Sequence, residues 1–438
     1  MKNRFHFRIS LGTFIFLVIL STAAFSQLPF TGVNLAGAEF GGSHLPGTYN
    51  QHYTYPIRAE VDYFVGKSMN TFRLPFKWER LQHSEFADLN AAELSRIKNF
   101  VEYATSKNAY TILDPHNYAR YYGQVIGKEL PVEAFADFWQ KLASEFKENS
   151  LVIFGLMNEP HGMETELWLS DANAAIEAIR STGAENLILV PGNAYTGAHS
   201  WTSNWYGTPN GTVMQNVVDP LDNYAFDLHQ YFDDNSSGTS ESCVNTTIGS
   251  QRLKNVTNWL RQHNERGFLG EFGVSTNETC LQALDDMLAY MDENSDVWLG
   301  WTYWAAGPWW GDYMFSIEPR NGQDRPQMDI LEQHLGGSSA VTNAVYRVND
   351  FSMSQNYPNP FNGATRIDFE ISRPGQVQII VYDVLGNQVS LLLDQQLSSG
   401  RHSIQFSTTA ANLASGIYFY KLIYENKTWD LKRMLLMQ

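Results

Sequence analysis

Positive charge is scarce in this 438-residue sequence. It holds 30 Lys and Arg against 46 Asp and Glu, which gives a formal net charge of -16 at pH 7. Such an acidic chain repels phosphates, which argues against nucleic acid or an anionic membrane surface as a partner. No Gly-rich loop of the GxGxxG or GxxxxGK type follows the first apolar run, and HExxH and CxxC motifs are absent. We therefore expect no nucleotide, no metal and no other cofactor.

Long charge-free apolar runs are also scarce, with one exception at the N-terminus. Three basic residues precede the stretch "ISLGTFIFLVILSTAAFS", and the small residues at positions 24 and 26 fit a signal-peptidase site. We predict a cleaved export signal over residues 1–26, with an uncleaved anchor as the alternative. Cysteine is nearly absent as well. Because disulfides persist outside the cytosol, we expect Cys243 and Cys280 to be bonded, and two buried thiols are the alternative.

Between residues 30 and 337, short apolar runs alternate with longer amphipathic stretches such as "DLNAAELSRIKNFVEYATSKN". The eight strand-like runs are TGVNLAG, MNTFRLPF, AYTILDPH, LVIFGLMNEP, NLILVPG, NYAFDLHQYF, RGFLGEFG and DVWLGWTYW. This βα rhythm, repeated eight times, predicts an α/β fold with a (β/α)8 TIM barrel over residues 27–337. A doubly wound open sheet would give the same alternation.

Polar, ionisable or aromatic residues stand at the C-terminal ends of most of these runs, where barrel enzymes place their functional groups. They are Arg73, His116, Asn117, Asn158, Glu159, His229, Tyr231, Glu271 and Trp304. Each one alone is equally explained as a salt-bridge partner or a core residue, but the complete set is not. Glu159 and Glu271 are predicted to face each other across the barrel mouth, and two converging carboxylates are the equipment for glycoside hydrolysis. Repulsion between them should raise the pKa of one.

Six motifs carry a resemblance to a known family. They are "FRLPF", "LDPHNYARYYG", "GLMNEPHG", "HQYFD", "GEFG" and "WTYWAAGPWW". In this order they resemble glycoside hydrolase family 5, in particular its secreted endo-β-1,4-glucanases. The resemblance implies that Glu159 is the general acid/base and Glu271 the nucleophile of a retaining hydrolase. It places Trp304 under the sugar before the cleaved bond.

The neighbouring residues can then be given supporting roles. Asn158 is placed to hydrogen-bond the 2-hydroxyl of the sugar at the cleavage point. Tyr231 shares a strand face with His229 and would donate to Glu271. Arg73 would add positive charge near that carboxylate, and His116 would contact the substrate or the acid/base network.

Aromatic rings are expected along the cleft, because sugars present C–H faces. Candidates that follow predicted strands, besides Trp304, are Trp78, Tyr195, Trp201, Trp205, Trp309 and Trp310. For each of these six, a place in the core is as good an interpretation.

The composition changes after residue 337. A small-residue linker over 338–350 leads into runs of alternating β-branched and aromatic residues, which predict a small C-terminal antiparallel β-sandwich over 351–438. The segments "NYPNPFN", "VYDVLGNQV", "ASGIYFYKL" and "KRMLLMQ" resemble the sorting domain of the type IX secretion pathway of Gram-negative bacteria. Gly363 departs from that pattern, because the family commonly has proline there. A generic carbohydrate-binding module is the alternative.

We therefore expect a monomeric, secreted or cell-surface endo-β-1,4-glucanase. Its partners would be β-glucan polysaccharide and the outer-membrane secretion machinery, since the sorting-domain resemblance implies passage through periplasm and outer membrane. Mannan and xyloglucan are competing substrates, because barrel specificity resides in the loops. A non-catalytic glucan-binding barrel is the alternative from another class, and it would require the loss of a carboxylate that this sequence retains.

Overall fold

The computed structural model describes residues 28–335 and 351–437, the second range without 354, 357, 372–373, 384–385, 399, 408–412 and 425–426. The predicted signal peptide over 1–26 and the predicted linker over 338–350 lie outside the described residues. Within the ranges described, no helix is both long and apolar enough to cross a membrane.

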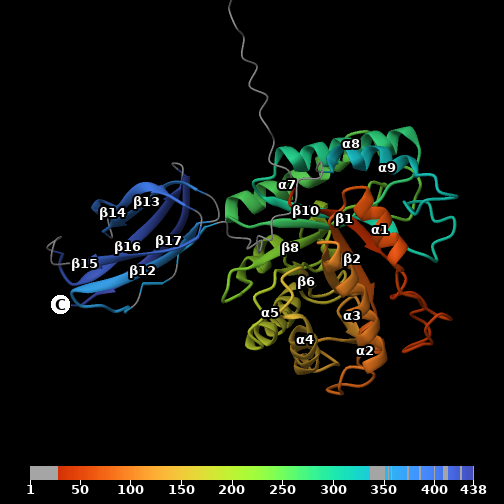
Figure 1. Cartoon of the computed structure of the whole chain (residues 1–438), viewed down its shortest axis with the longest axis horizontal. Helices are drawn as coiled ribbons and strands as arrows, with labels where there is room; N and C mark the ends of the chain where they lie inside the picture. Colours follow the sequence, from red (N-terminus) through yellow and green to blue (C-terminus); the bar gives the residue numbers. More distant parts are fainter. Residues whose placement is uncertain are drawn as a thin grey trace, which may run out of the picture.

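Eight parallel strands close into a barrel in the order β1-β10-β9-β8-β7-β6-β3-β2 (Figure 1). They are β1 (Phe30–Leu35), β2 (Thr71–Phe76), β3 (Tyr110–Pro115), β6 (Val152–Gly155), β7 (Ile188–Pro191), β8 (Tyr224–His229), β9 (Gly267–Glu271) and β10 (Trp298–Ala306). Each predicted run overlaps one of these strands, although β1 begins one residue before its run and β10 ends two residues after its run. Because the sheet closes on itself, the (β/α)8 prediction is confirmed and the open doubly wound sheet is excluded.

Helices connect successive strands and surround the barrel (Figure 1). They are α1 (Arg58–Gly66), α2 (Trp78–Leu81), α3 (Ala91–Ser106), α4 (Val132–Phe146), α5 (Thr165–Ser181), α6 (Asn210–Val213), α7 (Ile248–His263), α8 (Glu278–Glu293) and α9 (Pro326–Leu331). Shorter elements are β4 (Arg120–Tyr121), β5 (Gln124–Val125), η1 (Ala194–Thr196), η2 (Ala198–Ser200), η3 (Met214–Asn216) and η4 (Glu332–His334). Asn90 and Asn277 cap α3 and α8, because each side chain accepts backbone N–H groups that the first turn leaves unpaired.

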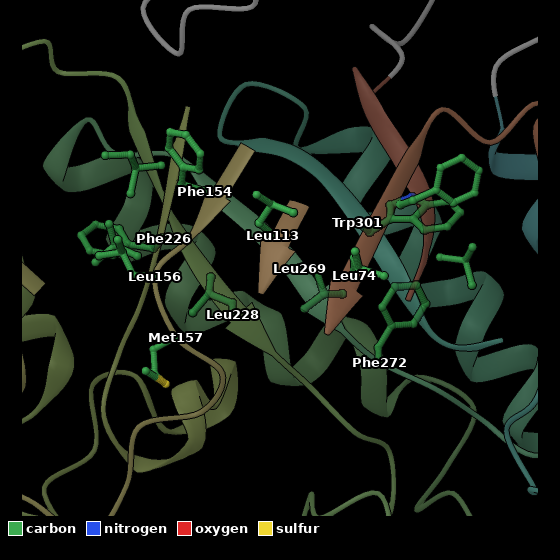
Figure 2. Packing of buried hydrophobic residues seen from close by; sticks show 14 of the residues in the cluster. Leu74, Leu113, Phe154, Leu156, Met157, Phe226, Leu228, Leu269, Phe272 and Trp301 are labelled. Atoms are coloured by element: carbon green, nitrogen blue, oxygen red, sulfur yellow. The ribbon is translucent and has the colours of Figure 1, made fainter. Parts of the chain in front are cut away.

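The alternation of side chains along each strand separates two apolar clusters. Outward-facing residues pack with residues of the surrounding helices, and Figure 2 shows part of this cluster; the strand residues labelled there include Leu74, Leu113, Phe154, Phe226, Leu228, Leu269 and Trp301. Inward-facing residues form a separate plug: Phe30, Tyr110, Ile112, Ile153, Leu187, Leu189, Ala225, Phe268 and Leu299. Further along the strands, the buried residues between the outward-facing ones become polar: Asn34, Arg73, Asp114 and Asp227. The inward-facing residues are therefore apolar near the start of the strands and polar towards their C-terminal ends.

The C-terminal unit consists of two antiparallel sheets. One has the order β11-β12-β15, and the other has the order β14-β13-β16-β17. Their strands are β11 (Phe351–Met353), β12 (Ala364–Ile371), β13 (Gly375–Tyr382), β14 (Gln388–Leu397), β15 (Gly400–Ser407), β16 (Gly416–Tyr424) and β17 (Lys427–Leu436). Buried residues of both sheets, including Ile367, Phe369, Val377 and Tyr420, belong to one core. The predicted antiparallel β-sandwich is confirmed.

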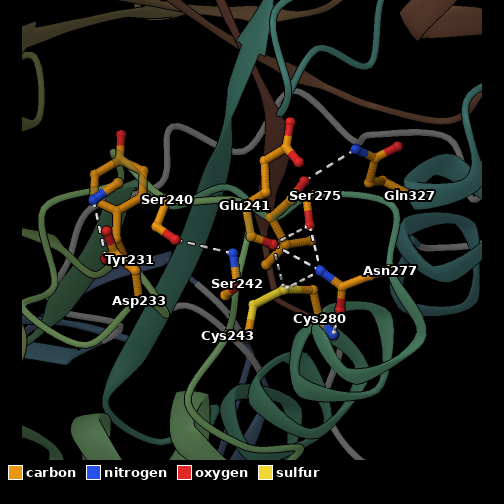
Figure 3. Close-up of a disulfide and its surroundings, with 12 residues drawn as sticks. Tyr231, Asp233, Ser240, Glu241, Ser242, Cys243, Ser275, Asn277, Cys280 and Gln327 are labelled. Atoms are coloured by element: carbon orange, nitrogen blue, oxygen red, sulfur yellow. Dashed lines mark hydrogen bonds between the residues drawn. A yellow bond between two sulfur atoms is a disulfide. The ribbon is translucent and has the colours of Figure 1, made fainter.

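A disulfide joins Cys243, in the loop after β8, to Cys280 in the first turn of α8 (Figure 3). The Cα atoms are 5.3 Å apart. Hydrogen bonds hold the loop at the same place, because the backbone oxygen of Glu241 accepts from Ser275 Oγ and, at 2.7 Å, from Asn277 Nδ2. The predicted pairing of the two cysteines is confirmed.

Removing this disulfide should weaken the fold. The bond closes a loop with a sequence separation of 37 residues, and the chain entropy it removes from the unfolded state predicts a loss of about 2–4 kcal/mol in the Cys243→Ser/Cys280→Ser double variant. Urea denaturation of the full chain, followed by tryptophan fluorescence, measures the loss. Wild-type protein under reductant should match the double variant. An unchanged midpoint in both samples would contradict the prediction.

Asp171, on α5, carries a buried carboxyl group without a hydrogen-bond partner among the described residues. Burial raises its pKa from 3.8 to about 7. The folded chain therefore holds this proton at pH values where the unfolded chain has released it. Stability falls as the pH rises from the unfolded value towards 7, because deprotonation places an unpaired charge in the core.

Asp171→Asn removes this titration. Between pH 5 and pH 8, we expect the free energy of unfolding of the variant minus that of the wild type to increase by about 2 kcal/mol. Paired urea denaturation curves at the two pH values test this. A stability difference that is the same at both would show that Asp171 does not titrate in the folded state.

Candidate active site

The two predicted carboxylates meet at the C-terminal mouth of the barrel. Glu159 follows β6, and Glu271 is the last residue of β9. One ligand atom each of Glu159, Glu271 and His229 lie within 4.8 Å of one another. His229 Nδ1 lies 2.8 Å from Glu159 Oε1 and 3.5 Å from Glu271 Oε2. Three different strands thus bring their terminal side chains to one point.

Donors from two sides surround Glu271. Arg73 Nη1 donates to Oε1 at 2.7 Å, and the Tyr231 hydroxyl donates to Oε2 at 3.0 Å. The carboxylate is buried, so these contacts compensate its charge where water does not reach it. They also fix its orientation towards Glu159.

Glu159 has a different environment. Its side chain retains 16% exposure, and its one hydrogen-bonding side-chain neighbour in the described chain is His229. Burial raises the pKa of Glu159 to about 8, although Arg73 acts in the opposite direction, and Asp114 adds to the rise. The predicted rise is therefore present, but burial and Asp114 cause it rather than repulsion from Glu271. Burial also lowers the pKa of His229 to about 4, so the ring is neutral and its contact with Glu159 is a hydrogen bond rather than an ion pair. At neutral pH, Glu159 therefore carries a proton.

The backbone of Glu159 is strained. Its φ is 44°, in the left-handed region that residues with a side chain seldom adopt. Such conformations persist where the surroundings impose them, and they concentrate at functional sites. The strained residue lies four positions after β6 ends at Gly155.

Arg73 connects the residues of this site. Its guanidinium donates to Asn34 Oδ1 and Asn158 Oδ1, both at 2.8 Å, and forms an ion pair of 3.1 Å with Asp114 besides that with Glu271. Burial acts to lower the pKa of Arg73, but the neighbouring carboxylates outweigh it and raise the pKa above its ordinary value. Since the amide oxygen of Asn158 faces Arg73, its buried Nδ2 is left without a partner among the described residues.

His116 and Trp304 form one wall of the site. Their rings stack at a centroid distance of 5.4 Å and an interplanar angle of 18°, and Trp310 lies edge-on to Trp304 at 5.8 Å. Both residues are almost fully buried. The contacts with His116 and Trp310 therefore hold the Trp304 ring in place.

Asn117 lies apart from the carboxylates. Its Nδ2 donates to Glu79 Oε2 at 2.7 Å, and its Oδ1 accepts the backbone N–H of Trp78 at 2.9 Å. Both polar groups of the side chain are thus used to hold the loop after β3 against α2. This arrangement gives Asn117 a supporting place and no free group for a substrate.

The aromatic candidates divide by exposure. Trp78 and Trp201 are fully buried, so the core interpretation holds for both. Tyr195, Trp205 and Trp309 are exposed by 49%, 66% and 42%. These three remain candidates for contact with a ligand.

The loop between Tyr231 and Cys243, part of which Figure 3 draws, folds back against the Tyr231 ring at Gly238. Gly238 has a φ of 69°, and a Cβ atom there would lie 2.7 Å from the Tyr231 ring. The Asp233 carboxylate accepts the backbone N–H of Gly238 at 3.1 Å, which fixes this close approach. The loop that ends at Cys243 therefore supports the hydroxyl group that donates to Glu271.

The sequence prediction missed three polar residues of the barrel interior: Asn34, Asp114 and Asp227. A signal for two of them was present. Asp114 is two residues before His116, and Asp227 is two residues before His229, so each lies on the same strand face as a residue that was predicted. Asn34 has no such marker, because the residues two positions away from it are Gly32 and Ala36, and neither was predicted to belong to the site.

The group formed by Glu159, His229 and Glu271 could also coordinate a cation, since two carboxylates and an imidazole suit a divalent ion. Coordination would compete with Arg73 and Tyr231 for the oxygens of Glu271. The existing hydrogen bonds instead equip the site for proton transfer.

A closed parallel barrel with two carboxyl groups converging at its C-terminal mouth defines the class of barrel glycosidases. Residues 31–307 match the family described as cellulase (glycosyl hydrolase family 5), and residues 355–436 match the secretion system C-terminal sorting domain. The chain belongs to glycosyl hydrolase family 5 and carries a C-terminal sorting domain. Both family resemblances that the sequence motifs predicted are confirmed.

Several known proteins are similar to the barrel part of the chain. The probable endo-β-1,4-glucanase B of Aspergillus oryzae is 43% identical over 314 residues, which cover 71% of this chain and 92% of the relative. The solved structure of XacCel5A in complex with cellopentaose has 51% identity and a TM-score of 0.69, and it covers 70% of this chain and 99% of its own. Pseudomonas stutzeri endoglucanase Cel5A in complex with cellobiose has 36% identity and a TM-score of 0.65, covering 71% and 94%.

Proposed function

We propose that this chain is a retaining endo-β-1,4-glucanase in which Glu159 is the general acid/base and Glu271 the nucleophile. The observation that carries the proposal is the unequal environment of two facing carboxyl groups. Glu271 accepts hydrogen bonds from Arg73 and Tyr231, whereas Glu159 is protonated at neutral pH. One group is thus suited to attack and the other to donate a proton.

The separation of the two groups supports retention. Retaining enzymes place their carboxyl groups about 5–5.5 Å apart, whereas inverting enzymes leave about 6.5–9.5 Å for a water molecule. In this barrel, one oxygen of Glu159 and one of Glu271 lie within 4.8 Å. This distance between one oxygen of each group fits the shorter, retaining separation better than the longer, inverting one.

In the first step, Glu271 attacks the anomeric carbon, and Glu159 gives its proton to the leaving glycosidic oxygen. The Nδ2 group of Asn158, unpaired in the described chain, would donate to the 2-hydroxyl of the same sugar as positive charge develops on the ring. The negative charge of Glu271 is consumed in the ester bond. Tyr231 and Arg73 hold the carboxylate in line during the attack.

In the second step, Glu159 acts as a base. It takes a proton from water, whose oxygen attacks the anomeric carbon and releases Glu271. Two displacements at one carbon restore the original configuration.

The substrate is inferred from the relatives and from the aromatic wall. The similar proteins are named as endo-β-1,4-glucanases, and one solved relative holds cellopentaose. Trp304, held by His116 and Trp310, supplies a flat surface for a glucosyl unit. We therefore propose cellulose and soluble β-glucans as substrates ahead of mannan or xyloglucan.

We also propose the division of the chain and its destination. Residues 1–26 would be a signal peptide, 27–337 the catalytic domain, 338–350 a linker and 351–438 the sorting domain. The match of residues 355–436 to a secretion sorting domain supports export through the periplasm and the outer membrane. The secretion machinery would be the partner of this domain, and the catalytic domain would act as a monomer.

The carboxylate roles can be tested with the full chain on carboxymethyl cellulose, barley β-glucan, glucomannan and xyloglucan. We expect new reducing ends mainly from the first two. Glu159→Gln and Glu271→Ala should each lose at least about 10³-fold of kcat, because each removes a group that acts in the transition state. Glu102→Gln, on the exposed surface of α3, is the matched control and should keep full activity.

The outcomes separate the alternatives. Proton NMR during the reaction identifies the anomer that is released first. A retaining enzyme should release the β anomer, whereas release of the α anomer would show that the enzyme inverts the configuration. A preference for glucomannan would keep the mechanism and change the substrate. Tight glucan binding without reducing ends would instead support a non-catalytic binding protein.

The pH dependence of kcat/KM gives a separate test. Burial raises the pKa of Glu159 to about 8, and the first step needs its protonated form. Activity should therefore be retained below this value and fall tenfold per pH unit above it, with the loss of one proton. Circular dichroism at each pH verifies that the chain is folded. A profile that stays flat to pH 9.5 would exclude Glu159 as the acid.

A further inference from the structure

Asp114 is a buried carboxylate that the proposed mechanism does not use. It lies on β3, two residues before His116, and its side chain points into the barrel beside Arg73. Its Oδ2 atom lies 2.8 Å from His116 Nδ1 and 3.1 Å from Arg73 Nη2. One oxygen atom of Asp114 thus contacts both the guanidinium of Arg73 and the imidazole of His116.

The contact decides where His116 carries its proton. Burial raises the pKa of Asp114 to about 6, opposed by Arg73, and burial lowers the pKa of His116 well below its ordinary value. Above pH 6 the pair therefore consists of a carboxylate and a neutral ring. A carboxylate only accepts, so Nδ1 of His116 must hold the proton and Nε2 must be an acceptor.

The orientation of the ring is fixed independently of its proton. Trp304 stacks on one face at 5.4 Å, and Tyr118 meets the ring edge-on at 5.5 Å. Among the described residues, none forms a hydrogen bond with Nε2, whereas Nδ1 is bound to Asp114. The ring thus keeps one unused acceptor beside the aromatic platform.

We propose that Asp114 is a positioning residue that holds His116 in the Nδ1–H tautomer, so that Nε2 accepts a hydrogen bond from a hydroxyl of the sugar on Trp304. The inference rests on the proposed function for the presence of that sugar. The tautomer itself does not depend on it. Without Asp114, Nε2 would be protonated in part of the molecules and would present a donor to a hydroxyl that has to donate.

Asp114 also compensates the charge of Arg73, and the test must separate the two roles. Asp114→Asn is isosteric and keeps an acceptor near Arg73, but its amide group can also donate to His116 Nδ1. Asp171→Asn, a buried aspartate on α5 away from the site, is the matched control for the same exchange. His116→Asn removes the ring through which Asp114 is proposed to act.

The kinetic experiment uses the full chain with cellopentaose as the probe. We expect Asp114→Asn to lower kcat/KM about ten- to hundredfold, the effect of one hydrogen bond to a charged or oriented group. Asp171→Asn should stay within about twofold of the wild type. In the His116→Asn background, adding Asp114→Asn should cost no more than about twofold, because the shared effect is already lost. If the loss of kcat/KM in the double variant equals the product of the losses in the two single variants, Asp114 acts through Arg73 and not through His116. That result would overturn the proposal.

The tautomer is measured directly by NMR of full chain labelled with ¹⁵N-histidine, with the His116 signals assigned from their loss in His116→Asn. The wild type should show a protonated Nδ1 and an unprotonated Nε2, and Asp114→Asn should populate the Nε2–H form. A protonated Nε2 in the wild type, or an unchanged spectrum in Asp114→Asn, would overturn the proposal. Wild-type inactivity on cellopentaose would instead refute the proposed function and leave the tautomer result standing.

Discussion

The charge of Arg73, buried inside the barrel, is the constraint on which the mouth of this barrel depends. An isolated guanidinium in such a place is very costly, so it persists only where acceptors and opposite charge surround it. The Nη1 and Nη2 groups of Arg73 have such partners, whereas its buried Nε has no hydrogen-bond partner among the described residues. Its partners come from four different strand ends: Asn34 on β1, Asp114 on β3, Asn158 after β6 and Glu271 on β9. The planar fork of the guanidinium fixes their directions as well as their distances. One side chain thereby links the ends of strands that are far apart in sequence.

Burial raises the pKa values of the carboxyl groups around this cation, and its charge acts against that rise. Asp114, Asp227 and Glu159 compete with Glu271 for the positive charge of Arg73, and burial raises their pKa values to about 6, 7 and 8. Identical functional groups therefore differ in protonation at one pH because of where the sheet places them. Separating an acid from a nucleophile needs no chemical difference between two glutamates.

The fold and most of the site were predictable because both follow from periodicity. Eight apolar runs fixed the barrel, and the strand-end rule selected Glu159 and Glu271 before any geometry was known. The periodicity of apolar and polar residues does not specify the hydrogen-bond partner of each polar atom. Asn117 is one residue after His116, yet its side chain is bound by Glu79 and the backbone of Trp78. The burial of Trp201 could not be predicted either, because an aromatic residue that follows a strand can pack in the core or contact a ligand.

The two cysteines have a consequence for folding after export. A chain with four cysteines can form three sets of two bridges, but a chain with two can form one bridge and no incorrect intramolecular one. The bonds from Ser275 and Asn277 to the Glu241 carbonyl bring the two sulfur-bearing segments together without the covalent link. Oxidation can therefore follow folding instead of guiding it. An unspecific oxidant outside the cytosol is sufficient, and no isomerase is needed to correct its products.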